Sequence, residues 1–188
     1  MGFKRWTRKR FGRAREGAAA AEFALIVPWF AWITLGLAEV SLMGLAQSSM
    51  DYAMSEVARE IRTGEVQTAG LSQSQLKTEI CDKLNQFMAM SCSNLYLDIR
   101  SFPGFVNVTN TNPLNSSGQL QSGTFVYQPG GPSDIVLVRG FYTWDIITPL
   151  MQSVFGNVGG TQRLISSSIL FRNEPWPAAP PPSPPSTT

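Results

Sequence analysis

The stretch Arg15-Glu-Gly-Ala-Ala-Ala-Ala-Glu-Phe23 decides how this chain is organised, because it joins a basic tail to an apolar segment that continues to Ala38. Alanine is the strongest helix former, so residues 18–21 predict the start of a helix. Between Glu22 and Glu39 lie 16 uncharged, mostly apolar residues. As a helix they would measure about 24 Å, short of the roughly 30 Å hydrocarbon core of a bilayer. A spanning helix must therefore include residues 18–21 or continue past Glu39, and either choice draws one glutamate towards lipid.

The charge of the chain is concentrated at its N-terminus. Residues 1–16 carry a net charge of +6 and the remainder −4, which gives the overall +2. Lysine and arginine beside an apolar segment are the signal for a cytoplasmic N-terminus, so we expect a membrane and no nucleic acid as the partner of this tail. The apolar region lacks an Ala-x-Ala cleavage site at its end, and a small residue, Gly17, precedes it instead. Residues 1–17 therefore resemble a leader whose removal after Gly17 would leave the apolar helix, beginning at Ala18, in the mature chain.

The helical pattern continues well beyond the apolar segment. Apolar and small residues recur at three- and four-residue spacing at Leu42, Leu45, Ala46, Ser49, Ala53, Val57 and Ile61. We therefore predict one helix over 18–63 that ends at Gly64, with an apolar first half and an amphipathic second half that packs on a domain. Pro28 cannot donate a backbone hydrogen bond, so it predicts a kink, although membrane helices also tolerate proline.

Residues 64–71 are predicted to be a linker, and residues 72–172 to form the domain. Ser72 and Gln75 match a capping box and predict a second helix that ends near Met90. On one continuous helix Cys81 and Cys92 would lie about 16 Å apart, too far for a disulfide. Either the helix stops before Ser91 and the two cysteines form a disulfide in an oxidising compartment, or both remain buried thiols.

The second half of the domain has the pattern of strands. Leu95, Leu97 and Ile99 alternate with polar residues, and residues 135–144 and 163–171 are rich in β-branched and aromatic side chains. Residues 105–109 and 124–127 are candidates for shorter strands, residues 110–123 for a loop, and residues 146–155 for a short interrupted helix. The order predicts an α+β fold, in which the long helix lies across one face of an antiparallel sheet of about four strands. Residues 173–188 hold seven of the 13 prolines and are predicted to be a disordered tail.

The sequence contains no recognisable catalytic constellation. Histidine, the commonest general base and metal ligand, is absent. Asp98, Asp134 and Asp145 lack the spacing of a metal site and are predicted to be surface or turn residues. We therefore expect no enzyme activity, no metal and no cofactor.

Glu22 is the residue for which a purely structural role is least satisfactory. A carboxylate drawn into the apolar layer is expensive unless it meets a positive partner. A cut after Gly17 would create a new α-ammonium group on Ala18, in the same chain or in a neighbour. Pairing of this group with Glu22 would make helix packing specific for one register.

The order of basic leader, Gly17, Glu22, Phe23 and apolar helix resembles the processing signal of type IV pilin-like proteins. The string over residues 15–28, the cysteine pair, the segment 94–100 and the ending 167–175 are similar to the TadE-like family of the tight-adherence (Tad/Flp) pilus. This resemblance implies a type IV pilin-like fold and a minor pilin or pseudopilin that primes or caps the pilus for adhesion. The implied partners are a prepilin peptidase that cuts after Gly17, other Tad/Flp pilins and minor pilins, the inner-membrane assembly platform, and membrane lipid.

The resemblance implies a single pass through the bacterial inner membrane with a periplasmic domain, and a second location at the pilus tip on the cell surface. It leaves open a TadE or a TadF role, and incorporation in the fibre or retention in the membrane. The alternative is an uncleaved bitopic envelope protein, whose periplasmic domain binds a ligand or surface and in which Glu22 is incidental.

Overall fold

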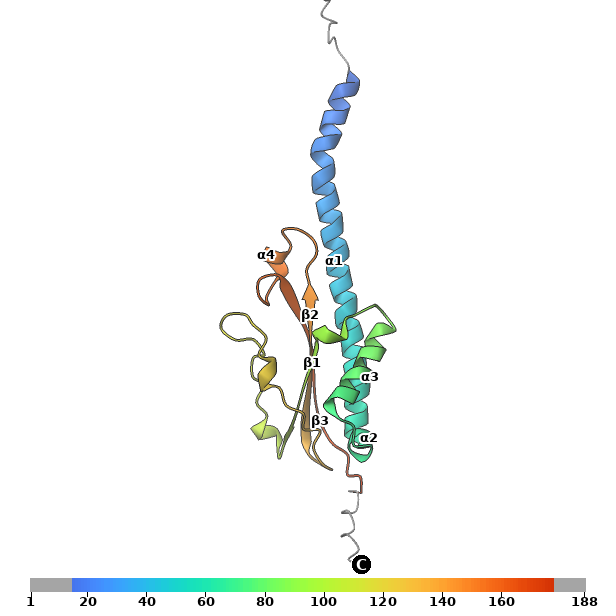
Figure 1. Ribbon diagram of the computed structural model, residues 1–188, viewed down its shortest axis with the longest axis vertical. Coiled ribbons are helices and arrows are strands. Elements are labelled where there is room, and N and C mark those ends of the chain that lie inside the picture. Colours follow the sequence, from blue (N-terminus) through green and yellow to red (C-terminus); the bar gives the residue numbers. More distant parts are fainter. Residues whose placement is uncertain (1–14, 178–188) are drawn as a thin grey trace, which may run out of the picture.

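The structure, a computed structural model that describes residues 15–177, is dominated by one long helix (Figure 1). α1 runs from Arg15 to Thr63 and continues through Pro28. Its C-terminal half packs on a small domain, whereas its N-terminal half projects beyond that domain (Figure 1). The predicted basic tail up to residue 14 and the proline-rich residues 178–188 lie outside the described residues.

The domain combines helices with one antiparallel sheet, so the predicted α+β class is confirmed. Its elements are α2 (Glu65–Thr68), α3 (Gln73–Asn85), β1 (Leu95–Phe102), β2 (Ile135–Asp145), α4 (Gln152–Phe155) and β3 (Gln162–Arg172). The strands lie in the order β1-β2-β3, with both pairs antiparallel. α1 and α3 cover one face of the sheet, and the long connection between β1 and β2 lies over the other (Figure 1).

The expected strand count of about four is slightly too high, because the structure describes three. Residues 105–109 contain a 3₁₀ turn, Phe105–Asn107, and no strand. Residues 124–127 contribute only one isolated parallel bridge, between Tyr127 and Ile99. There the Ile99 amide donates to the Val126 carbonyl at 2.8 Å, and the Ile99 carbonyl accepts from Gln128 at 2.8 Å.

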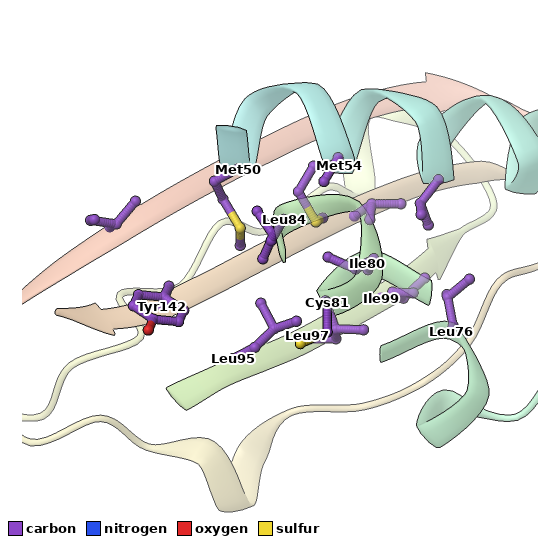
Figure 2. Packing of buried hydrophobic residues seen from close by; sticks show 14 of the residues in the cluster. Met50, Met54, Leu76, Ile80, Cys81, Leu84, Leu95, Leu97, Ile99 and Tyr142 are labelled. Atoms are coloured by element: carbon purple, nitrogen blue, oxygen red, sulfur yellow. The ribbon is translucent and has the colours of Figure 1, made fainter. Parts of the chain in front are cut away.

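The core lies between α1, α3 and the sheet. Met50 and Met54 point from α1 towards β2, and the side chains of α3 and β1 meet them from the other sides (Figure 2). The approach is so close at Gly140 of β2 that a Cβ there would collide with the Met50 methyl group. A side chain at this position would force the ends of both methionines to move.

The buried face of α1 differs in one place from the predicted face. Ala46, Ser49, Ala53, Val57 and Ile61 are buried as expected, but Leu42 and Leu45 are 46% and 44% exposed. On the N-terminal side of Ala46 the buried positions are Gly36 and Glu39, which continue the stripe at three- and seven-residue spacing. A leucine off this stripe points away from the sheet, so its hydrophobicity alone does not place it in the core.

The second helix ends five residues before its predicted end near Met90. The capping box of Ser72 and Gln75 is present as predicted at the start of α3. At the other end the Asn85 side chain accepts a hydrogen bond from the Met90 amide at 2.9 Å, which turns the chain back. Cys81 and Cys92 then meet in a disulfide, with their Cα atoms 5.7 Å apart.

An ion-pair network also ties α3 to α1. The Lys83 ammonium lies 3.1 Å from carboxylate oxygens of both Glu60 and Glu79. Burial alone would lower the pKa of Lys83, but its hydrogen bonds to the two carboxylates outweigh this effect and raise that pKa above its ordinary value.

Residues 173–177, which the sequence places in the disordered tail, are packed against the domain. Asn173 is buried, and its amide group donates to the Pro129 and Gly131 carbonyls at 3.1 and 2.9 Å. The Glu174 amide donates to the Arg62 carbonyl at 2.9 Å, and the two side chains form an ion pair at 3.3 Å. These contacts fasten the end of β3 to the end of α1.

Asp98 is a fully buried residue, so its predicted placement at the surface or in a turn is wrong. It forms a buried ion pair with Arg139 of β2, whose guanidinium Nε donates to the carboxylate at 3.0 Å. The second oxygen of Asp98 accepts from the Val126 amide at 2.9 Å. The remaining donors of Arg139 reach Asn110 and the Thr111 carbonyl at 3.0 and 2.7 Å. The pair thus holds the loop after β1 against the outer face of the sheet.

Replacement of Asp98 by Asn should destabilise the domain by about 3–5 kcal/mol, because it leaves the buried Arg139 guanidinium without a countercharge. The exposed residue Asp82 provides the control, and Asp82→Asn should change stability by less than about 0.5 kcal/mol. Denaturant unfolding of the detergent-solubilised chain, followed by tryptophan fluorescence, measures both values. Equal stability of the two variants would contradict this account of the pair.

Candidate functional site: the projecting half of α1 and the domain tip

The projecting half of α1, residues 17–35, is the candidate functional surface. Every side chain in it is exposed except that of Trp32, which is half-buried. Its large exposed hydrophobic residues surround the helix: Phe23, Leu25, Ile26, Val27, Trp29, Phe30, Ile33 and Leu35. Within the described residues this is the one helix long and apolar enough to cross a membrane. A helix that is apolar on all sides and has no partner in its own domain suggests a membrane anchor.

The structure places the predicted processing and assembly residues on the first turns of this helix. Gly17 and Ala18 are exposed, and no atom lies within 4 Å of the position of a Gly17 Cβ. Glu22 and Phe23 follow on the next turn and are also exposed. Among the side chains of residues 17–177, none forms an ion pair or hydrogen bond with the Glu22 carboxylate. The structure therefore presents Glu22 on the surface, where only another molecule or a residue outside this range can pair with it.

The disulfide and the aspartates lie elsewhere, in the domain. Cys81 and Cys92 join α3 to the start of β1, away from the projecting helix. Asp134 closes a turn by accepting from the Gly131 amide at 2.7 Å, and Asp145 is exposed at the end of β2. Over the described side chains, no group of three or more Cys, Asp or Glu residues is placed to hold a metal ion.

Sequence reasoning missed the residue that joins the projecting helix to the domain. Glu39 is only 6% exposed, and its two carboxylate oxygens accept hydrogen bonds from the Ile147 and Thr148 amides at 2.6 and 2.8 Å. These amides belong to residues 146–155, the first part of the segment between β2 and β3, which we call the domain tip. The bonds are charge-assisted and therefore stronger than bonds between neutral groups.

Two further contacts hold the domain tip against α1. The Trp32 indole N–H donates to the Pro149 carbonyl at 2.7 Å. One turn along the helix, Gly36 faces Met151 so closely that a Cβ would collide with the Met151 methyl group. The tip thus packs along α1 from Trp32 to Glu39. No sequence signal could have indicated this, because the partners are separated by more than 100 residues and the bonds use backbone amides.

This contact fixes the length of helix that extends beyond the domain. From Gly17 to Gly36 the helix contains 20 residues and measures about 30 Å, which matches the hydrocarbon core of a bilayer. The carboxylate of Glu39 is already satisfied by the domain tip. Of the two glutamates that flank the apolar run, Glu22 is therefore the one left within the projecting segment.

The described residues thus define a class of protein in which one N-terminal apolar helix carries a small α+β domain. Residues 17–59 match the family model described as TadE-like protein. The resemblance to this family, which the sequence indicated, is confirmed over that segment. No curated protein and no solved structure matches the chain. The family match covers the projecting helix and most of the half that contacts the domain, and it suggests a protein related to the Tad pilus.

Replacement of Glu39 by Ala should release the domain tip, because two charge-assisted hydrogen bonds are lost. Hydrogen bonds to charged groups contribute about 1.5–3 kcal/mol, so amide exchange of Ile147 and Thr148 should accelerate by roughly one to two orders of magnitude. Hydrogen–deuterium exchange of the full chain in detergent measures this effect. Glu56→Ala on the same helix removes a partly exposed carboxylate with only a 3.9 Å ion pair and should leave the tip unchanged. Unaltered amide exchange in both variants would contradict the proposal that Glu39 holds the domain tip against α1.

Proposed function

We propose that this protein is a minor pilin or pseudopilin of a Tad/Flp pilus, which a prepilin peptidase cleaves after Gly17 and which primes or caps pilus assembly for adhesion. Its role is structural, and the chain acts by packing its helix among those of other pilins and minor pilins. The observation that carries the proposal is the projecting segment of α1, which is apolar on all sides and bears Glu22 near its start.

The geometry around Gly17 supports the processing step. Gly17 and Ala18 precede the apolar segment and are not covered by the domain, so a peptidase at the cytoplasmic face of the inner membrane could reach the bond between them. Cleavage would remove the basic leader and keep the whole apolar helix. The family match begins at residue 17, next to the proposed cleavage site.

Glu22 supports the assembly step. The residue lies four positions after Ala18, which is about one helical turn, so the new α-ammonium and the carboxylate lie on the same face of the helix, about 6 Å apart along its axis. Within one chain the amine can reach Glu22, and between two chains the same pairing fixes one register of neighbouring helices. A buried ion pair is best attested in this kind of role, the selection of register.

The domain supports a position at the end of a fibre. About half of α1 lies against the sheet within the domain, and the other half projects beyond the domain (Figure 1). A subunit with this shape can insert its projecting helix into a helical bundle, while the domain covers the end of the bundle. The inner-membrane assembly platform would meet the chain before insertion.

Processing provides the first test of this function. The intact mass of the membrane-extracted protein should correspond to a chain that begins at Ala18 in cells with a prepilin peptidase, and to the uncleaved chain in cells without it. Gly17→Ala is the conservative variant, and a bulky substitution, Gly17→Leu, should prevent cleavage. A chain that retains residues 1–17 in both strains would favour the alternative, an uncleaved bitopic envelope protein with a ligand- or surface-binding domain.

Replacement of Glu22 by Ala should leave membrane insertion and the domain unchanged but strongly reduce piliation, because the partner of the Ala18 ammonium is lost. Electron microscopy and the amount of sheared pili measure the loss. Glu56→Ala, which removes a carboxylate from the domain-covered half of the same helix, serves as the control and should assemble normally. Equal piliation of the two variants would contradict the pairing.

A further inference from the structure

The domain tip has an apolar surface that the proposed helix packing does not use. Ile147, Leu150 and Val154 are 83%, 68% and 69% exposed, although all three are aliphatic. They lie on one segment, next to the point where α1 leaves the domain. Exposed aliphatic residues gathered at one place on a small domain indicate a contact surface.

The charge pattern distinguishes this segment from the rest of the domain. Between Asp145 and Arg163 there are 17 residues, 146–162, and none is charged. The opposite end of the domain, by contrast, carries the ion pairs of Arg59, Arg62 and their carboxylate partners. The uncharged end is therefore the end that faces along the apolar half of α1 (Figure 1).

The position of the domain tip along α1 indicates what contacts its aliphatic surface. The tip contacts α1 from Trp32 to Glu39, and the 20 residues from Gly17 to Gly36 already span about 30 Å. When α1 crosses a bilayer, its last turn inside the hydrocarbon is therefore the turn against which the tip packs. The aliphatic side chains of the tip are then at the level of the lipid headgroups and the adjoining acyl chains.

From this continuity we infer that the domain tip is a second membrane contact, in which Ile147, Leu150 and Val154 insert into the outer leaflet of the same bilayer that α1 spans. The inference rests on the membrane anchoring by α1 that underlies the proposed function. Such a contact would hold the domain at a fixed tilt on the periplasmic surface before assembly. Glu39 and Trp32 position the tip, because their hydrogen bonds to residues 147–149 keep the aliphatic side chains at this height.

Depth-dependent fluorescence quenching tests this contact on the full chain in lipid vesicles. Single cysteines replace Leu150 or Val154, and each carries an environment-sensitive nitrobenzoxadiazole label, while the Cys81–Cys92 disulfide stays unreduced. The matched control is Val106, an aliphatic residue that is 99% exposed. It comes after the end of β1, which pairs with the start of β2 and so lies at the end of the sheet away from the domain tip. Phe30→Cys, on the projecting helix, reports whether α1 spans the bilayer at all.

The labels at residues 150 and 154 should show blue-shifted emission and quenching by nitroxides placed shallowly in the lipid. The label at residue 106 should resemble a label in water, and the label at residue 30 should be quenched best by deep nitroxides. Quenching at residue 30 without quenching at residues 150 and 154 would overturn the inference and leave the anchor intact. Absence of quenching at residue 30 as well would overturn the anchor itself.

The same labels separate lipid from a protein partner. If a second copy of the chain covers the tip, residues 150 and 154 will be shielded from both lipid nitroxides and aqueous iodide, and the shielding will increase with the protein-to-lipid ratio. That outcome would also overturn the inference. Two label sites guard against a local effect of either substitution, since both should respond in the same way.

Discussion

The hydrogen bonds from the Ile147 and Thr148 amides to the Glu39 carboxylate are the contact on which the rest of the structure depends. They fix the point on α1 at which the domain ends. On the C-terminal side of this point the helix packs on the sheet through Ala46, Met50 and the residues that follow. On the N-terminal side the helix is exposed over residues 17–31. One part of α1 therefore packs on the sheet, and the other part extends beyond the domain. The position at which the Glu39 carboxylate is bound sets the length of the part that extends.

Three carboxylates of this chain differ in how their negative charge is compensated. Asp98 is fully buried but receives hydrogen bonds from Arg139 and the Val126 amide, so its charge is compensated inside the domain. Glu39 is nearly buried and is compensated by two backbone amides. Glu22 has neither kind of partner among the described side chains, although it lies in the apolar segment. Inside the apolar layer of a membrane such a carboxylate needs a partner from outside the folded domain, which is the physical basis of the assembly role that we propose for it.

The fold could be predicted from sequence to the extent that it follows from local patterns. The long helix, the capping box of Ser72 and the strands around residues 95–102, 135–145 and 162–172 follow from periodicity, capping residues and β-propensity. The expected fourth strand is not formed, because residues 124–127 have a strand-like composition but only one bridge to β1. The second helix is shorter than predicted because its end depends on the bond between Asn85 and the Met90 amide. Propensity does not contain this information, since such bonds form only once the chain has turned.

The sequence by itself determined that an apolar helix follows a basic tail, that Gly17 precedes it and that Glu22 interrupts its start. These properties depend on composition and spacing along the chain, which are complete before folding. Only the tertiary structure decided which glutamate is left without a partner among the described side chains, that Asp98 lies in the interior, and that residues 147–151 of the uncharged segment lie beside α1. Each of these outcomes depends on contacts between residues that are far apart in sequence. Local sequence patterns do not reveal which distant residue a given side chain will contact.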